Sequence, residues 1–235
     1  TLLVGDKVSS YSENDIFIIG SNLPHAFKSD KNTEDTSKML SIFFTTSSFG
    51  DSFFELNELA EIKIFLSKTL QGLVIKTHKN EIIKNFIKLK DASKLERFIL
   101  FLEVLKIFSN AKSAPLSMFV YDKKYSDIEG KRMRNVFDFT LENACQNITL
   151  DDIASVANMT KNAFCKYFKK RTNKTFVRFL IELRIENACK LLSTNKDLSI
   201  NDIAFKSGFN NISNFNRQFK MIKHMTPNTF RNTNL

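Results

Sequence analysis

Apolar and polar residues follow two different rhythms along this chain. In the first part, short apolar runs end at turn residues: residues 15–19 (DIFII) precede Gly20–Asn22, and residues 40–44 (LSIFF) and 73–75 (LVI) are runs of the same kind. β-Branched and aromatic runs bounded by Gly, Ser and Asn predict strands. We therefore expect a region rich in strands from residue 2 to about residue 89.

Helical spacing interrupts these strands and then follows them. Apolar residues three or four positions apart predict helices over residues 56–70, 81–89 and 94–108. The last helix is more apolar than a small surface helix requires, at Phe98, Leu102, Leu105 and Ile107. Two explanations are open, a dimer seam or packing against the N-terminal sheet. Residues 109–131, with a proline, a glycine and a charged run, form the expected linker.

From Met133 onward the spacing is helical to the end of the chain. A first amphipathic helix ends near Cys145. A second is expected from its cap at Thr149 through Ala157, with two aspartates in the first turn, where the helix dipole favours acidic groups.

An internal duplication runs through this helical half. LDDIA at residues 150–154 returns as INDIA at 200–204, and FCKYFKK at 164–170 returns as FNRQFKM at 215–221. Both copies place the two motifs in the same order with similar spacing. The chain therefore contains the same structural unit twice.

Each copy predicts two helices joined by a sharp turn. Asn158 and Gly208 tolerate the positive φ that such a turn requires. Ala154 and Ala204 are small enough for two helices to cross closely there. The core side of the first copy is formed by Met159, Phe164 and Phe168. One such motif alone would be read as an ordinary helical hairpin, but two in register favour paired helix-turn-helix units.

The outward faces of the two second helices carry residue types that bind DNA. They are Lys161, Asn162, Cys165, Lys166 and Lys169 in the first unit, and Asn211, Ser213, Asn216, Arg217 and Lys220 in the second. Arg and Lys suit guanine, Asn suits adenine, and Lys one turn further along suits phosphate. Residues 176–192, between the units, predict one helix of roughly 26 Å, long enough to hold two reading heads against one side of a duplex. Its expected buried face is Phe179, Leu180, Leu183, Ala188, Leu191 and Leu192.

Charge separates the two halves of the chain. The net charge is +10, yet residues 1–130 hold 17 basic and 17 acidic residues, whereas residues 131–235 hold 18 basic and 8 acidic ones. A basic half indicates a polyanion partner, although a solvated lysine-rich surface would give the same count. Because the charge lies with the duplicated unit, it favours DNA.

These motifs resemble a known family. ITLDDIA at residues 148–154, RIENACKLL at 184–192 and GFNNISNFNRQFKMIKHMTPNTFR at 208–231 are similar to the DNA-binding domain of AraC/XylS-type transcription regulators. The resemblance implies a domain of seven helices with two helix-turn-helix units. It implies base contacts from Asn162, Cys165, Lys166, Ile212, Ser213, Asn216 and Arg217. We expect contacts with the DNA backbone from Thr160, Lys161, Lys169, Lys170, Asn211 and Lys220.

The chain departs from the family pattern at two positions. His224 stands before Met-Thr-Pro, where the family usually has glycine, and Cys165 stands where a longer polar side chain is common. Both departures are compatible with the fold, and both put individual base contacts in question.

The N-terminal half is similar to the cupin-like sensor domains attached to such regulators. DIFIIGSNLPH at residues 15–25 looks like the closing part of that barrel. His25 either lines a ligand cavity or caps a strand end. Metal cupins carry a His-x-His pair with a following Glu, whereas His25, His78 and His224 are isolated. We therefore expect no metal, no cofactor and no catalytic site.

The sequence as a whole predicts an α+β protein. It comprises a cupin-like sensor domain over residues 1–89, a helical connector and dimerisation segment over 90–130, and an all-α DNA-binding domain over 131–235. Because the chain opens at Thr1 rather than Met, we expect residues to precede it and the cupin-like domain to be truncated.

The predicted function is a sequence-specific transcription regulator, an activator that binds double-stranded DNA as a homodimer. Its expected partners are RNA polymerase and a small-molecule effector. The rival hypotheses are a dimer that binds DNA without a ligand and a small cupin enzyme with a nucleic-acid module; the missing metal-ligand cluster disfavours the enzyme. With no signal peptide and no long apolar run, we expect a cytoplasmic protein with three reduced cysteines.

Overall fold

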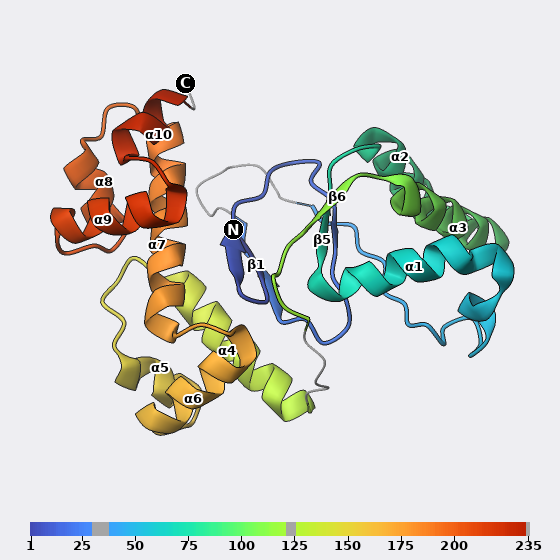
Figure 1. Ribbon diagram of the computed structural model, residues 1–235, viewed down its shortest axis with the longest axis horizontal. Helices are drawn as coiled ribbons and strands as arrows, with labels where there is room; N and C mark the ends of the chain where they lie inside the picture. Colours follow the sequence, from blue (N-terminus) through green and yellow to red (C-terminus); the bar gives the residue numbers. More distant parts are fainter. Residues whose placement is uncertain (30–37, 121–125, 234–235) are drawn as a thin grey trace. The chain divides into compact units, whose positions relative to one another are not determined.

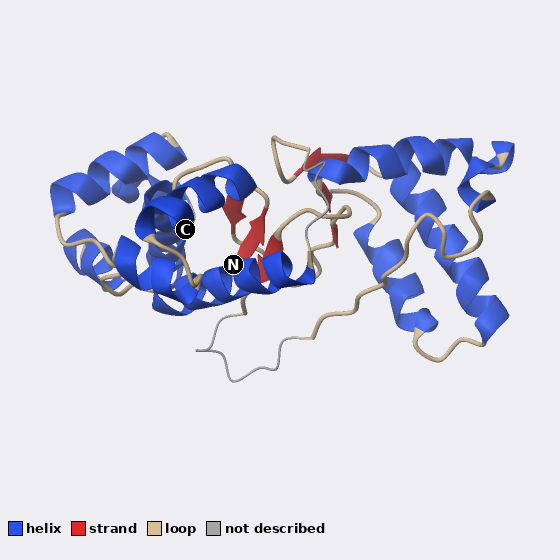
Figure 2. Cartoon of the chain, turned by 90° about the horizontal axis from the view of Figure 1, so that it is seen from below, coloured by secondary structure: helices blue, strands red, loops and turns tan. Residues whose placement is uncertain are grey.

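The computed structural model describes residues 1–29, 38–120 and 126–233. Contacts divide the chain into two units (Figure 1). One contains residues 1–10, 24–28 and 124–235, and the other contains residues 11–23 and 29–123. These units differ from the predicted boundaries at residues 89 and 130, because two N-terminal segments belong with the C-terminal helices. Helices dominate, and the strands are short (Figure 2).

The unit of residues 11–23 and 29–123 combines a small sheet with three α-helices. Its strands are β3 (Phe17–Ile18), β5 (Leu73–Ile75) and β6 (Ser113–Pro115), which pair antiparallel in the order β3-β5-β6. Its α-helices are α1 (Ala60–Lys68), α2 (Lys79–Leu89) and α3 (Lys94–Asn110), accompanied by the 3₁₀ turns η1 (Phe53–Glu55), η2 (Asn57–Leu59) and η3 (Thr69–Gln71). The predicted helices and the strand at residues 73–75 are confirmed. The expected linker is shorter than predicted, because β6 and the start of the next helix lie within it.

Helix α3 packs with one face against α1, α2 and strand β5. Ser93 and Glu96 form a capping box at its start. Phe101, Phe108 and their buried neighbours on α3 share a core with strand β5. The packing explanation for this apolar helix therefore holds for one face, while Leu95 is 69% exposed on another.

The predicted strand at residues 40–44 is wrong. The structure has no regular secondary structure there, and Phe43 is 89% exposed. An apolar run forms a strand only when a neighbouring strand accepts its backbone hydrogen bonds. None of the pairings within the described residues involves this run.

The second unit joins a three-stranded sheet to seven helices. Strands β1 (Leu2–Val4), β2 (Lys7–Ser9) and β4 (His25–Phe27) pair antiparallel in the order β2-β1-β4. The helices are α4 (Asp127–Asn143), α5 (Leu150–Val156), α6 (Lys161–Thr172), α7 (Phe176–Thr194), α8 (Ile200–Lys206), α9 (Ile212–Lys223) and α10 (Pro227–Thr233). The seven-helix domain implied by the resemblance is confirmed.

The N-terminal sheet belongs to the core of this helical unit. Leu3 and Val8 lie in the same buried cluster as Val136 of α4 and Phe179 of α7. In the described part of the chain, the strands thus form two separate three-stranded sheets rather than one closed barrel.

Two hydrophobic cores share helix α7. Its first half contributes Phe176, Phe179, Leu180 and Leu183 to a core with α4, α5 and α6. Its second half contributes Ile185, Ala188, Cys189 and Leu192 to a separate core with α8 and α9. The predicted buried face of this helix is confirmed, except that Leu191 is only half-buried. We call the α5–α6 end the first head and the α8–α10 end the second head; Figure 1 shows them at opposite ends of α7.

Candidate nucleic-acid interface

Each head contains a helix-turn-helix whose first helix begins at a capped N-terminus. Thr149 accepts a hydrogen bond from the backbone N–H of Asp152 at 3.2 Å, and Ser199 accepts one from Asp202 at 3.1 Å. The hydroxyl of Thr149, followed by its backbone N–H, holds the pKa of Asp152 below its ordinary value. The expected cap at Thr149 is confirmed.

The two turns have the same hydrogen-bond pattern. Met159 N–H donates to the carbonyl of Ala154 at 2.9 Å, and Phe209 N–H donates to that of Ala204 at 3.0 Å. These bonds close a Schellman-type helix end, which needs a residue at positive φ. Asn158 supplies φ 52° and Gly208 supplies φ 91°, as the sequence predicted.

Tight crossing of the helices follows from buried residues at the turn. Ala154 is 2% exposed and Ala204 is 1% exposed. Phe164 and Phe168 of α6, and Phe215 and Phe219 of α9, are fully buried at matching positions. The duplication in the sequence is therefore a duplication of the fold.

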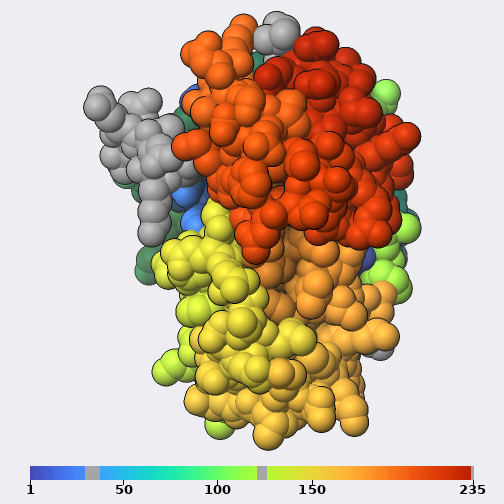
Figure 3. Space-filling view, turned by 90° about the vertical axis from the view of Figure 1, so that its left-hand side faces the viewer, coloured from blue at the N-terminus to red at the C-terminus, as the bar shows by residue number. Residues whose placement is uncertain are grey.

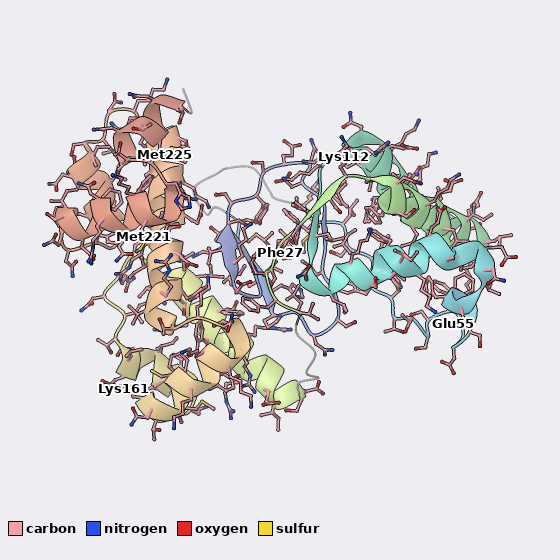
Figure 4. All side chains as sticks on the ribbon, in the orientation of Figure 1. Phe27, Glu55, Lys112, Lys161, Met221 and Met225 are labelled. Atoms are coloured by element: carbon pink, nitrogen blue, oxygen red, sulfur yellow. The ribbon has the colours of Figure 1, made fainter. Side chains whose placement is uncertain are left out.

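Helices α6 and α9 present polar faces opposite these cores. On α6, Lys161, Asn162, Lys166, Lys169 and Lys170 are exposed and Cys165 is half-buried. On α9, Ser213, Asn216, Arg217 and Lys220 are exposed and Ile212 is half-buried. Figure 3 shows a face of this unit on which the second head, in red, lies above the first, in yellow and orange. In Figure 4, Lys161 marks the first head and Met221 the second.

The half-buried members of this set also belong to the cores. Cys165 packs against the core of the first head, and Ile212 against that of the second. Both therefore offer only part of their side chains to a partner.

Several predicted contact residues also have roles within the fold. Thr160 caps α6, accepting from Ala163 N–H at 3.4 Å, and Asn211 caps α9, accepting from Asn214 N–H at 3.0 Å. Lys161 forms an ion pair with Asp151 at 2.7 Å. These three side chains help set the start of each outward-facing helix.

Arg217 is held by its own helix. Its guanidinium donates to the side-chain oxygen of Asn214 at 3.0 Å. A shallow groove of about 660 Å³ beside Arg217 is also lined by Asn216, Lys220, Asn201 and Asn228. Asn201 and Asn228 were not singled out from the sequence, because only the folded structure places them beside α9.

The backbone conformation of His224 explains how this position can depart from the family pattern. It ends α9 in the left-handed region, with φ 59°. Glycine adopts that conformation most easily, but other residues are found there at a small energetic penalty. The exposed ring thus replaces the usual glycine without breaking the turn.

His25, for which the sequence left open a place in a ligand cavity or at a strand end, belongs to the unit of the C-terminal helices. His25 is exposed on β4, opposite Val4, and its ring contacts that of Phe27 edge-on. It is therefore part of the sheet that joins the helical unit.

The cysteines and acidic groups are dispersed. Cys145 is exposed, Cys165 half-buried and Cys189 buried, and all three are free thiols. Burial is the main cause that raises the pKa of Cys189 to about 12. Across residues 1–29, 38–120 and 126–233, no three His, Cys, Asp or Glu side chains come together as a metal site. No helix in those ranges is both long and apolar enough to cross a bilayer.

Comparison with known proteins supports the helical unit. Residues 153–233 match the family described as a helix-turn-helix domain. The uncharacterized HTH-type transcriptional regulator YdeC of Bacillus subtilis (strain 168) is 29% identical over 107 residues, which is 46% of this chain and 36% of that protein. An uncharacterized HTH-type transcriptional regulator in the cgkA 5' region of Pseudoalteromonas carrageenovora is 33% identical over 101 residues, 43% of this chain and 59% of that one.

A solved structure gives a weaker likeness. It is a transcriptional regulator from Chromobacterium violaceum, described as AraC-type, with 21% identity and a TM-score of 0.42, covering 44% of this chain and 92% of that one. The chain matches less than two thirds of the length of either curated relative. The motifs, the paired helix-turn-helix geometry and the family match agree: residues 153–233 form a helix-turn-helix domain, and its motifs resemble those of the AraC/XylS-type regulators.

Proposed function

We propose that this chain is a sequence-specific DNA-binding transcription regulator that reads two adjacent major-groove segments, one with α6 and one with α9. The observation that carries the proposal is the repetition of one helix-turn-helix, with matching turns and matching buried phenylalanines, on a single linking helix. Helix α7 has 19 residues, about 28 Å at the usual rise. That length suits two heads on one side of B-DNA, where major-groove segments recur about every 34 Å.

We assign base reading to the outward side chains of α6 and α9. On α6 they are Asn162, Cys165 and Lys166, and on α9 they are Ile212, Ser213, Asn216 and Arg217. The exposed members can form hydrogen bonds with base edges, with Arg suited to guanine and Asn to adenine. The half-buried Cys165 and Ile212 suit apolar contact with a thymine methyl group.

We assign contacts with the DNA backbone to the residues around them. They are Thr160, Lys161, Lys169, Lys170, Asn211 and Lys220. The N-terminal turns of α6 and α9 add backbone N–H groups, which suit phosphate at a helix start. The excess basic charge of residues 131–235 supports this assignment.

The rest of the chain would regulate this binding. We assign residues 1–89 to a cupin-like sensor domain that accepts a small-molecule effector, with His25 as a candidate ligand contact, and residues 90–130 to a connector through which two copies dimerise. The exposed apolar side chains of α3 support the dimerisation role. The regulator would act in the cytoplasm as an activator that contacts RNA polymerase, without catalytic activity of its own.

Selection of bound duplexes from random DNA by the full chain tests the proposal. The enriched sequence should contain two short segments about one helical turn, roughly 10 base pairs, apart. If about 6 phosphates are neutralised, log K should fall with log salt at a slope near −5. Lys88→Ala, an exposed change on α2, is the matched control and should leave the slope unchanged. Failure to enrich any sequence would refute the proposal.

A further inference from the structure

The two heads are joined by little besides helix α7. Their hydrophobic cores are separate, and a cleft of about 320 Å³ opens beside Leu150 of the first head and Phe209 of the second. A single helix fixes the distance between two bodies better than it fixes their rotation, because each head can tilt where its own core ends. Another contact is needed to hold the heads in one orientation.

Arg184 of α7 makes that contact on the side of the first head. Its Nε donates to the carbonyl of Ala144 at 2.8 Å, and its terminal nitrogen donates to the carbonyl of Gln146 at 2.7 Å. Ala144 ends α4, where a helix leaves carbonyl groups without partners and favours a cation, and Gln146 follows two residues later. Asn187, one turn along α7, lies 3.5 Å from the sulfur of Cys145 in the same segment.

The turn of the second head closes the same junction. A Cβ placed on Gly208 would lie 2.8 Å from Arg184 Nε and 3.0 Å from both the Ala144 carbonyl oxygen and the Cys145 Cα. The turn between α8 and α9 therefore rests directly on the Arg184 guanidinium and on the segment that leads into α5. One arginine touches the linking helix, the first head's entry segment and the second head's turn.

We propose that Arg184 is a positioning residue that locks the rotation of the second reading head relative to the first, and so sets the spacing between the two DNA segments that the protein accepts. The inference rests on the proposed function. Arg184 need not touch DNA for this role, because it acts through the turn that aims α9. Its fork of donors reaches two carbonyls at once, which a lysine ammonium cannot match in the same planar geometry.

Spacing is a sharp measure of this rotation. One extra base pair moves a groove segment by about 3.4 Å and rotates it by about 35°. Two rigidly held heads cannot follow that change, whereas two loosely held heads can. Loss of the lock should therefore weaken discrimination between spacings more than it weakens binding to the preferred spacing.

The test uses the full chain and the duplex recovered by selection with the unaltered protein, together with versions lengthened or shortened by one base pair between the two segments. Arg184→Ala is the main variant, and Arg184→Lys is the conservative one. Arg231→Ala is the matched control, because Arg231 also donates to a carbonyl, that of Leu198 at 2.8 Å, but within the second head alone. Melting curves accompany every binding measurement.

The unaltered protein should bind the altered spacings at least about tenfold more weakly than the selected one. Arg184→Ala should reduce that difference to about threefold or less, with Arg184→Lys in between, while Arg231→Ala keeps the full difference even if its melting temperature falls. Full discrimination by Arg184→Ala, or by Arg184→Lys where the alanine variant does not fold, would overturn the inference. So would an unaltered protein that binds all spacings equally. Absence of any selected sequence would instead refute the proposed function.

Discussion

The hydroxyl of Ser10 donates to the buried carboxylate of Glu186, 3.2 Å away, so the end of an N-terminal strand is bonded to the helix that links the two heads. Lys223, at the end of α9, donates to the other oxygen of the same carboxylate at 2.5 Å. The first residues of the chain are thus structural members of the DNA-binding unit.

Leu3→Ala should destabilise that unit. Leu3 is 1% exposed within the core of α4, α6 and α7, and truncation of a buried leucine costs about 2–5 kcal/mol. Denaturant unfolding of the full chain measures the loss, with Lys7→Ala, an exposed change on the neighbouring strand, as the control. Equal stability of the two variants would show that the sheet does not contribute to this core.

The packing of the N-terminal sheet on the helices also affects the stability of fragments that lack the sheet. We expect residues 131–235 alone to fold as helices and bind DNA, because both heads and the excess positive charge lie there. The fragment should unfold at a lower denaturant concentration than the same unit in the full chain, since it lacks Leu3 and Val8. An unfolded fragment, or one that ignores DNA, would contradict the two-head interpretation.

Arg217→Ala and Lys220→Ala should separate base reading from phosphate binding. Arg217→Ala should cost about 1–3 kcal/mol on the selected site and relax the preference at one base pair. Lys220→Ala should weaken binding to all sequences alike and make the salt slope shallower by about one unit. A lower melting temperature with an unchanged selected sequence would mean that Arg217 serves only to hold Asn214.

Gly208→Ala should be harmful, whereas Asn158→Gly should be tolerated. Both positions have positive φ, but at Gly208 an added methyl group would also lie 3.0 Å or less from backbone and side-chain atoms. We expect Gly208→Ala to cost about 1–3 kcal/mol of unfolding free energy, because strain adds to the displaced contacts. Thermal melting of the two variants side by side measures this difference. A Gly208→Ala protein with an unchanged melting temperature would contradict the prediction.

Helix α3 should be the seam of a dimer. Leu95 is 69% exposed and Ile99 is 49% exposed, four residues apart on one face. We expect the full chain to sediment as a dimer and the Leu95→Glu, Ile99→Glu double variant as a monomer, because buried like charges oppose association. Lys94→Glu, beside the stripe, is the control and should remain dimeric. A monomeric unaltered chain at micromolar concentration would exclude the seam.

Acid should remove the capping contribution of Asp152. Since hydrogen bonds from Thr149 lower the pKa of Asp152 in the folded protein, its contribution is complete above the unfolded value of about 3.9 and is lost as pH falls through the lower folded value. The unaltered protein should therefore melt above Asp152→Asn at neutral pH, with the gap closing below about pH 4. A gap that is the same at all pH values would show that the charge is not involved.

Sequence predicted the helical half well because its signals are local. A positive-φ residue, a small residue at the crossing and phenylalanines at helical spacing specify each head within about twenty residues, and α5 to α9 follow them. The Thr149 cap is equally local. Even the conformation of His224 follows from its place at a helix end.

The N-terminal half was harder because strands depend on distant partners. The run at residues 40–44 has strand-forming composition but no partner among the described strands, while Leu2–Val4, which was not singled out, pairs on both sides. Whether a strand belongs with one core or another is set by packing across more than one hundred residues, as Ser10 and Glu186 illustrate. The Arg184 junction was missed for the same reason.

The separate cores of the two heads have an evolutionary consequence. A substitution inside one head need not disturb the folding of the other, so the two halves of a binding site can drift apart in sequence while each head stays intact. A duplicated unit whose copies share only one helix is free to specialise twice. Lys166 on α6 and Arg217 on α9, which follow equivalent buried phenylalanines by two residues, already differ in this way.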